Sequence, residues 1–291
     1  KKKKKKKEKE FFNPKKMKKA GSRIRIGNVE EVMKADSLRK AFTEFLCVLV
    51  FIFSAEGCLL YFSKIATKLY PPPTSQQPDY AQFLGIALTH GFGLMVAVAF
   101  GMNISGGHSN PAVTFGAFLG GHITLINTLL YSIAQCLGGF AALGILKFAS
   151  NGLMVNGWPG ATPVQGIKYM IPTVFFLTYA YYATIFDPKR GKKGAIGPVV
   201  IGFICVCNVM VGGGVFGAAM NPAMALCIAG FSGMWNNHWS YWVGSYLGAS
   251  LAALVYQTLN STDDGIYEQL PITTKAAFDE DTCKHLLITK P

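Results

Sequence analysis

Two long stretches of this sequence contain no Asp, Glu, Lys or Arg: residues 80–146 and residues 194–262. A soluble domain needs charged residues on its surface, and these stretches supply none. Hydrophobic residues make up 51% of the 291-residue chain, and the mean hydropathy is +0.30. Both values are typical of a protein whose solvent is lipid, so the sequence predicts an integral membrane protein.

The apolar residues form six segments long enough to cross a bilayer. We expect these spans near residues 41–63, 80–102, 123–148, 167–187, 195–213 and 239–259. Two further apolar segments, 111–120 and 222–231, are too short to cross. Such half-helices are tolerated at membrane depth only where protein or a water-filled cavity surrounds them. The expected fold is therefore an all-α membrane protein with six transmembrane helices and two re-entrant half-helices.

Each short segment begins with the same three residues, Asn110-Pro111-Ala112 in the first half and Asn221-Pro222-Ala223 in the second. Asn is a favoured N-cap residue, and Pro is favoured at the first helical position. Each triplet therefore predicts the start of a helix. If both starts meet inside the bilayer, two Asn amides and two positive helix ends face one point.

The order span, span, half-helix, span occurs twice along the chain. Because three spans are an odd number, the second copy is inverted relative to the first, as in many transporters. The basic loop 189–193 and the Lys-rich N-terminus lie on one side of the membrane, which the positive-inside rule makes cytoplasmic. We expect a channel domain over residues 37–260, with cytoplasmic tails over 1–36 and 261–291.

The net charge of +13 does not indicate a nucleic-acid-binding protein. Residues 1–20 carry twelve Lys against Glu8 and Glu10, so this segment alone supplies +10. A Lys block of this kind is typical of a disordered tail. The sequence contains no Ser/His/Asp set, no phosphate-binding loop and no metal-ligand spacing, so we expect no enzyme activity, no cofactor and no metal site.

The segment 103–116, which reads NISGGHSNPAVTFG, resembles the first signature loop of the aquaporin, or major intrinsic protein, family. Within that family the chain is most similar to plant-type tonoplast intrinsic proteins. Further similar segments are Glu56-Gly57, the loop 187–191 and residues 237–242. The resemblance covers roughly residues 37–260. It implies a homotetramer with one pore per subunit, in a vacuolar or plasma membrane, that conducts water or small neutral solutes.

The resemblance also implies roles for particular residues. Asn110 and Asn221 would donate hydrogen bonds to the permeating molecule, and Glu44 would brace the first signature loop. His108 would lie at the cytoplasmic mouth of the pore. The selectivity filter would consist of four residues: His90, Val209, Ala218 and Met224. The second half departs from the family pattern at Met170, where the Glu matching Glu44 is absent.

Most relatives carry Arg at the position of Met224, so this chain lacks one barrier to cations. Two half-charges at the helix starts, ~5 Å from a cation at an effective dielectric near 20, repel it by about 3 kcal/mol. A fixed Arg at ~4 Å would add about 4 kcal/mol. We therefore expect a water channel that also passes small neutral solutes such as glycerol, urea, ammonia and hydrogen peroxide.

Two other functions remain open. A flexible Met224 side chain could fill the pore, which would make the chain a non-conducting structural or junctional membrane protein. An ion channel that exploits the missing Arg would instead carry current.

Overall fold

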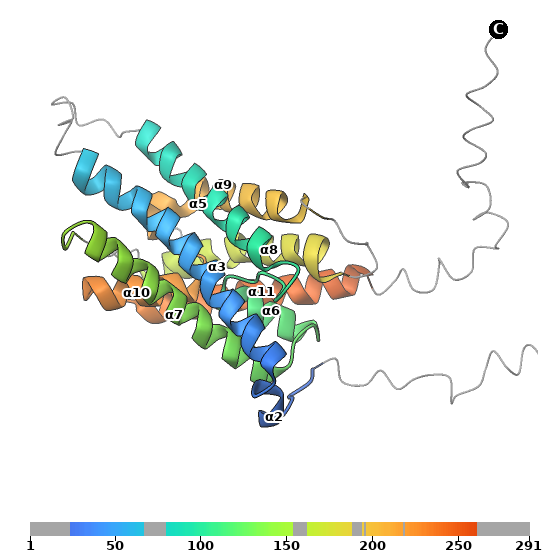
Figure 1. The fold of residues 1–291 in the computed structure, drawn as a ribbon. Helices are drawn as coiled ribbons and strands as arrows, with labels where there is room; N and C mark the ends of the chain where they lie inside the picture. The colour runs from blue at the N-terminus through green and yellow to red at the C-terminus, as the bar shows by residue number, and fades with distance from the viewer. Residues whose placement is uncertain are drawn as a thin grey trace, which may run out of the picture. The chain divides into compact units, whose positions relative to one another are not determined.

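The computed structural model describes residues 24–66, 80–153, 162–187, 194, 196–217 and 219–260. In this part of the chain every regular element is helical (Figure 1). The long helices are α3 (Ala35–Leu60), α5 (Tyr80–Gly101), α7 (Leu125–Ala149), α8 (Pro163–Tyr181), α9 (Ile196–Phe216) and α11 (His238–Asn260). The short helices are α2 (Val29–Val32), α6 (Pro111–Leu119) and α10 (Pro222–Ser232). Two π-helical segments, η1 (Tyr61–Ala66) and η2 (Tyr182–Phe186), extend α3 and α8.

The helices agree with the six spans and two half-helices expected from the sequence. Helices α3, α5, α7, α8 and α9 are long and apolar enough to cross a membrane. Helix α11, at 23 residues, matches the sixth predicted span, 239–259, and has the length to cross. Helix α6, with 9 residues, and helix α10, with 11, are too short to cross, as expected of half-helices.

The long helices pack side by side through close backbone contacts. Helix α3 contacts both α7 and α5, and α9 contacts both α5 and α8. At the α3–α7 contact, a Cβ atom on Gly138 would lie 2.3 Å from the carbonyl oxygen of Phe45. At the α8–α11 contact, a Cβ atom on Gly248 would lie 2.5 Å from the carbonyl oxygen of Ile171. Small residues thus allow the backbones to approach closely, as is common in membrane helices.

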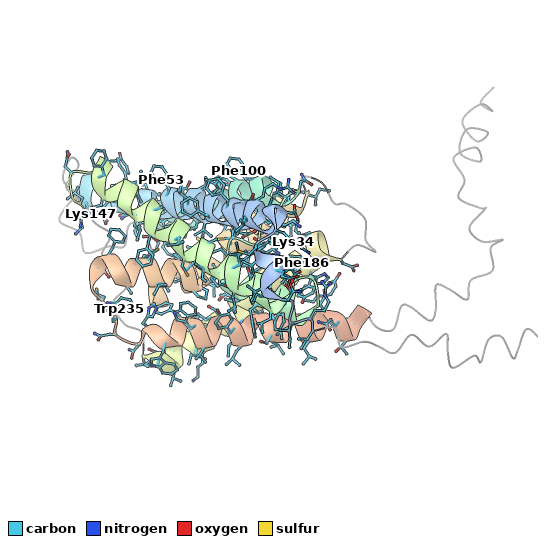
Figure 2. The ribbon with its side chains drawn as sticks, turned by 60° about the horizontal axis from the view of Figure 1, so that its bottom comes forward. Lys34, Phe53, Phe100, Lys147, Phe186 and Trp235 are labelled. Carbon is cyan, nitrogen blue, oxygen red and sulfur yellow. The ribbon has the colours of Figure 1, made fainter. Side chains whose placement is uncertain are left out.

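Large apolar side chains project outward along the long helices. In Figure 2, Phe53 on α3 and Phe100 on α5 are examples, and they are 41% and 57% exposed. Such side chains would be unfavourable in water. Facing lipid, they incur no such cost.

Part of the segment that the sequence analysis assigned to the N-terminal tail is helical. We assigned residues 1–36 to the N-terminal tail, whereas the structure forms helix α2 and starts α3 at Ala35. The carbonyl groups of Arg25 and Ile26 accept hydrogen bonds from the amides of Leu125 and Ile126, at 2.9 and 3.1 Å. These amides belong to the first turn of α7, where no intrahelical acceptor exists. Residues 24–34 therefore cap α7, and residues 1–23 lie outside the described part.

Candidate functional site

The two half-helices begin at a pair of asparagines that are bonded in the same way. The Oδ1 atom of Asn110 accepts from the amide of Ala112 at 2.8 Å, and that of Asn221 accepts from the amide of Ala223 at 3.0 Å. Each Asn is therefore the N-cap of its half-helix, and Pro111 and Pro222 occupy the first helical position.

The same two side chains connect the halves of the chain. Asn110 Nδ2 donates to the carbonyl of Met220 at 2.8 Å, and Asn221 Nδ2 donates to the carbonyl of Ser109 at 2.7 Å. Each amide thus bonds to the residue that precedes the other Asn. A primary amide has two N–H donors, so one donor on each Asn remains after these bonds.

A narrow cavity lies at this meeting point. Its polar lining consists of His90, Asn110 and Asn221, and its other lining residues are Phe51, Leu94, Leu177, Cys205, Met220 and Met224. The space open to a water centre is about 10 Å³, which is room for roughly one water molecule. A single water molecule in this cavity would therefore have both Asn side chains as neighbours.

His90 lines this cavity and is held through one ring nitrogen. Its Nδ1 atom lies 2.8 Å from the carbonyl oxygen of Ile86. Because a carbonyl can only accept, Nδ1 carries the hydrogen of this bond. The Nε2 atom is then the ring nitrogen that carries the lone pair. The ring meets Phe51 edge-on, with centroids 6.4 Å apart, which fixes its orientation.

Two of the four residues expected to form the selectivity filter line the narrow cavity. His90 and Met224 both line the cavity, and Met224 is 1% exposed. Val209 is buried on α9, one turn beyond Cys205, and is not among the residues that line this cavity. Ala218 lies outside the described residues.

Glu44 on α3 holds the segment that leads into Asn110. Its Oε1 atom accepts from the Ser105 hydroxyl at 2.5 Å and from the His108 amide at 2.9 Å. Its Oε2 atom accepts from the Ser109 amide and from the Gln135 side chain, both at 2.8 Å. Glu44 is fully buried, so these four donors replace the water that a carboxylate needs.

Gly107, in the same segment, lies close to the backbone of α5. Its φ is +60°, and a Cβ atom there would lie 2.7 Å from the carbonyl oxygen of Val98. Tyr181 on α8 donates its hydroxyl to the carbonyls of Gly107 and His108, at 3.0 and 3.1 Å. Residues 105–110 are thus bonded to α3 and α8 before the half-helix starts.

The second half shows a different kind of support. Met170, at the position of the missing Glu, is fully buried, and its side chain packs against Gly244 of α11. The side chain of Asn208 on α9 donates to the carbonyl of Thr173 on α8 at 2.8 Å. In the described part of this loop, Met220 is held by the Asn110 amide. In the second half, the packing of Met170 and the hydrogen bond from Asn110 to Met220 thus take the place of the carboxylate that holds the first half.

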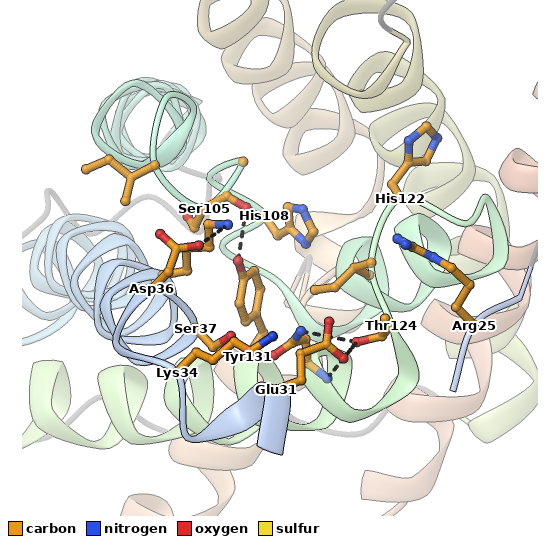
Figure 3. Close-up of a pocket in the computed structure, with 15 residues that line it drawn as sticks. Arg25, Glu31, Lys34, Asp36, Ser37, Ser105, His108, His122, Thr124 and Tyr131 are labelled. Carbon is orange, nitrogen blue, oxygen red and sulfur yellow. Dashed lines mark hydrogen bonds and ion pairs between the residues drawn. The ribbon is translucent and has the colours of Figure 1, made fainter. Parts of the chain in front are cut away.

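A wider, polar cavity of about 480 Å³ lies beside the segment before Asn110 (Figure 3). Ser105 and His108 line it on one side, and residues of the N-terminal segment 24–34 line it on another. Glu31 accepts a hydrogen bond from the Thr124 hydroxyl at 3.2 Å, which ties α2 to the start of α7. His108 is the residue of the segment before Asn110 whose buried side chain reaches this cavity.

His122 also lines the wide cavity, and its ring stacks on Phe186 with centroids 5.4 Å apart. Burial lowers the pKa of His122, and the nearby His108 lowers it further, while Asp187 opposes both effects. The backbone amide of His122 donates to the carbonyl of Ala117 at the end of α6, whereas its ring packs against aromatic side chains.

Comparisons with known proteins decide the family. The family model described as "Major intrinsic protein" matches residues 31–256. The chain is 43% identical to "Aquaporin TIP1-1" of Arabidopsis thaliana, over 86% of this chain and 97% of that protein. This chain belongs to the major intrinsic protein family. It is also 43% identical to "Aquaporin TIP1-2" of Musa acuminata, over 85% of this chain and 96% of that protein.

A solved structure agrees on the fold. The X-ray structure of the aquaglyceroporin from Plasmodium falciparum superposes with a TM-score of 0.63, at 21% sequence identity. The match covers 76% of this chain and 95% of that one. This major intrinsic protein is therefore a multi-pass integral membrane channel and not an enzyme.

Sequence reasoning missed part of the site of this aquaporin. Cys205, Phe51 and Leu177 line the narrow cavity, but nothing in the local sequence distinguishes them from other apolar residues of a span. Gln135 was missed as well. It donates to Glu44 at 2.8 Å and to Thr114 at 3.0 Å, and a buried amide in a span was a signal that it had a partner.

Proposed function

We propose that this aquaporin conducts water through the narrow cavity, driven by the osmotic gradient. The observation that carries the proposal is the reciprocal bonding of Asn110 and Asn221 at a site with room for about one water. The remaining N–H donor of each Asn would bond to the oxygen of the passing molecule. Donors on two sides would orient the water and replace the bonds it loses on leaving bulk solvent.

Exclusion of cations is part of the proposal. The N-termini of α6 and α10 each carry about half a positive charge, and both begin beside the cavity. Together they would repel a cation by about 3 kcal/mol at ~5 Å and a dielectric near 20. Loss of hydration in a site this narrow adds several kcal/mol. Neutral water meets neither cost.

We further propose that small neutral solutes pass. The lining has Met224 where most relatives carry Arg, and Phe51, Leu94 and Leu177 make the other walls apolar. We expect this lining, which lacks the Arg, to admit small neutral solutes that can hydrogen-bond to the Asn amides, among them glycerol, urea, ammonia and hydrogen peroxide. His90, Val209, Ala218 and Met224 would set the upper size limit.

The assembly and location follow from the resemblance to tonoplast intrinsic proteins. We propose a homotetramer in the vacuolar membrane, with the plasma membrane as the other candidate. Both termini would be cytoplasmic, because the N-terminal segment and the loop 189–193 are rich in Lys. Exposed apolar side chains such as Phe53 and Phe100 would face lipid or neighbouring subunits.

Stopped-flow light scattering on vesicles containing the purified full-length chain tests the proposal. We expect faster osmotic shrinkage than in protein-free vesicles of the same lipid and size, and silence in planar bilayers under a voltage. Shrinkage no faster than that of empty vesicles would favour the non-conducting structural protein. Current in the planar bilayer would instead favour the ion channel.

A further inference from the structure

The wide polar cavity is large enough to hold a ligand. Its volume of about 480 Å³ lies within the range of about 300–1,000 Å³ that is usual for small-molecule sites. Its lining comes from the N-terminal segment 24–34, the start of α3, the segment before Asn110 and the start of α7 (Figure 3). It shares no lining residue with the narrow cavity, so the water pore does not account for it.

Two cations that line this cavity are unpaired. Within the part of the chain that the structure describes, neither Arg25 nor Lys34 forms an ion pair. Figure 3 shows the two side chains on opposite sides of the cavity. Arg and Lys are the side chains that bind phosphate in proteins. Cations on two sides of one cavity favour a ligand that carries more than one phosphate group.

The two carboxylates of the lining do not cancel this positive charge. Asp36 is already paired with two cations of its own helix, Arg39 at 2.6 Å and Lys40 at 2.5 Å. Glu31 accepts the hydrogen bond from the Thr124 hydroxyl. One carboxylate charge is therefore left against the two unpaired cations, and the cavity favours an anion.

The cavity also contains polar groups that the protein leaves unbonded. Ser37 is 8% exposed, and its hydroxyl has no hydrogen-bond partner among the described residues. The Oδ1 atom of Asn127 is buried and likewise lacks a donor in this part of the chain. Buried polar groups in proteins are nearly always hydrogen-bonded. A ligand with hydroxyl groups would supply both missing partners, because a hydroxyl both donates and accepts.

The start of α3 adds to the attraction for an anion. Its N-cap residue, Lys34, makes no side-chain capping bond, so the first amides of α3 lack a side-chain acceptor. The N-terminus of a helix also carries about half a positive charge. Phosphate oxygens are well suited to such a helix end.

The position of the cavity selects the kind of phosphate ligand. The outward apolar side chains of α3 begin with Leu38 and Phe42, which are 46% and 61% exposed and follow Lys34 by about one and two turns. The cavity thus lies where the membrane-spanning part of α3 begins. Residues 15–23, directly before the described segment, contain four Lys and one Arg. Basic pockets and Lys-rich segments beside a transmembrane helix favour phosphorylated lipid headgroups.

From these features we propose that the wide cavity binds an inositol ring that carries two or more phosphate groups. Arg25 and Lys34 each hold a phosphate, and Ser37 and Asn127 bond to groups on the ring. The same phosphorylated ring occurs on a membrane lipid and free in solution, and the test below distinguishes these two sources. Binding at this cavity does not depend on the proposed water conduction.

Calorimetric titration of the purified full-length chain in a neutral detergent tests the site. The two probes are inositol trisphosphate and dioctanoyl phosphatidylinositol bisphosphate, which carry the same headgroup without and with a lipid tail. We expect both to bind, with one site per chain. Binding of the lipid that is tighter by about tenfold or more, from burial of its tail, assigns the site to a membrane lipid. Similar affinities assign it to the free inositol phosphate, and no binding of either probe overturns the proposal.

Variants of the lining test which groups hold the ligand. The double variant Arg25→Gln/Lys34→Gln should weaken the binding of both probes by about tenfold or more, because it removes the charge-assisted bonds. Ser37→Ala should weaken binding by about fivefold, and this hydroxyl has no partner in the fold to lose. Melting temperatures without ligand show that each variant is folded. Unchanged affinity in both variants would overturn the proposal.

Lys18→Gln/Lys19→Gln is the matched control. It removes the same charge from the Lys-rich segment, outside the described residues, and should leave both affinities unchanged. An equal loss in this control and in the Arg25→Gln/Lys34→Gln variant would overturn the proposal, since general attraction to a basic chain would then explain the binding. Dioctanoyl phosphatidylserine and inorganic phosphate should bind about tenfold more weakly or worse, and equal binding of either would also overturn it.

The outcome for this site is separate from that for the water pore, because the titration requires no water flow. A chain that conducts water and binds neither probe would refute this inference alone. A chain that binds the probes but shrinks no faster than empty vesicles would refute the proposed function and leave this site standing.

Discussion

Replacing Glu44 tests how the first half-helix is held in place. The carboxylate accepts four hydrogen bonds, from Ser105, the amides of His108 and Ser109, and Gln135. In Glu44→Gln, one oxygen becomes an NH₂ group that faces two of these donors. Whichever way the new amide turns, one backbone N–H loses its acceptor. The Ser105 hydroxyl has a second acceptor within 3.4 Å, the Gly101 carbonyl, and so loses least.

The cost of this change can be estimated. A buried N–H without an acceptor costs about 1–3 kcal/mol, and the bonds that remain weaken because charge-assisted bonds are roughly twice as strong as neutral ones. We expect a loss of about 2–4 kcal/mol for Glu44→Gln. For a domain of this size, that corresponds to a fall in melting temperature of roughly 5–15 °C.

Water conduction should also fall in Glu44→Gln. Glu44 holds the Ser109 amide, and the Ser109 carbonyl accepts the hydrogen bond from Asn221. The measurements are thermal unfolding in detergent and stopped-flow water permeability per reconstituted chain. Glu30→Gln, at an exposed carboxylate on α2, is the matched control and should match the parent in both. A Glu44→Gln protein with the parent's melting temperature and permeability would refute the reasoning. A lower melting temperature with unchanged permeability would refute only the link to conduction.

Three other changes have definite expected outcomes. Met224→Arg should add about 4 kcal/mol of cation repulsion and lower glycerol and urea permeability relative to water permeability. The control Met224→Leu should do neither. Unchanged solute permeability in the Arg variant would contradict our account of the filter. Gly107→Ala should destabilise the protein by about 2 kcal/mol or more, measured by thermal unfolding. Gly152→Ala, also at a positive φ but with open space around it, should cost less, and equal losses would contradict the argument from the Val98 contact. The lowered pKa of His122 means that the unfolded chain binds more protons below pH ~6.5. Stability should therefore fall as pH drops from 7.5 to 5.5, and fall less in His122→Phe; identical slopes would show that His122 does not contribute.

Much of the fold follows from local sequence. The lengths of the apolar segments predict the long helices, because a helix must bond all its own backbone groups in lipid. Asn110 and Asn221 predict the starts of α6 and α10 to the residue, because an N-cap bond reaches only two or three residues along the chain. The resemblance to the aquaporin family, carried by these same residues, is confirmed by the comparisons.

The structure of residues 24–34 could not be predicted from composition. Residues 24–34 follow a Lys-rich segment and read as part of a tail. Their order comes from contacts with the distant helix α7, where Leu125 and Ile126 donate to their carbonyls. Gly27, with φ of +77°, fits between Glu31 and Ile126. No rule that reads neighbours along the chain detects such a contact.

By itself the sequence determined that this chain crosses a membrane, where its helices begin, and that two Asn-capped half-helices are its distinctive feature. Only the tertiary structure decided which side chains surround the narrow cavity. Both Cys205 and Val209 lie on α9, one turn apart, and the sequence alone favoured Val209. The depth and rotation of α9 are fixed by its contact with α5, where a Cβ atom on Gly91 would lie 2.6 Å from the Gly202 carbonyl oxygen. That contact between distant segments brings the Cys205 thiol to the cavity, a position that no local pattern predicts.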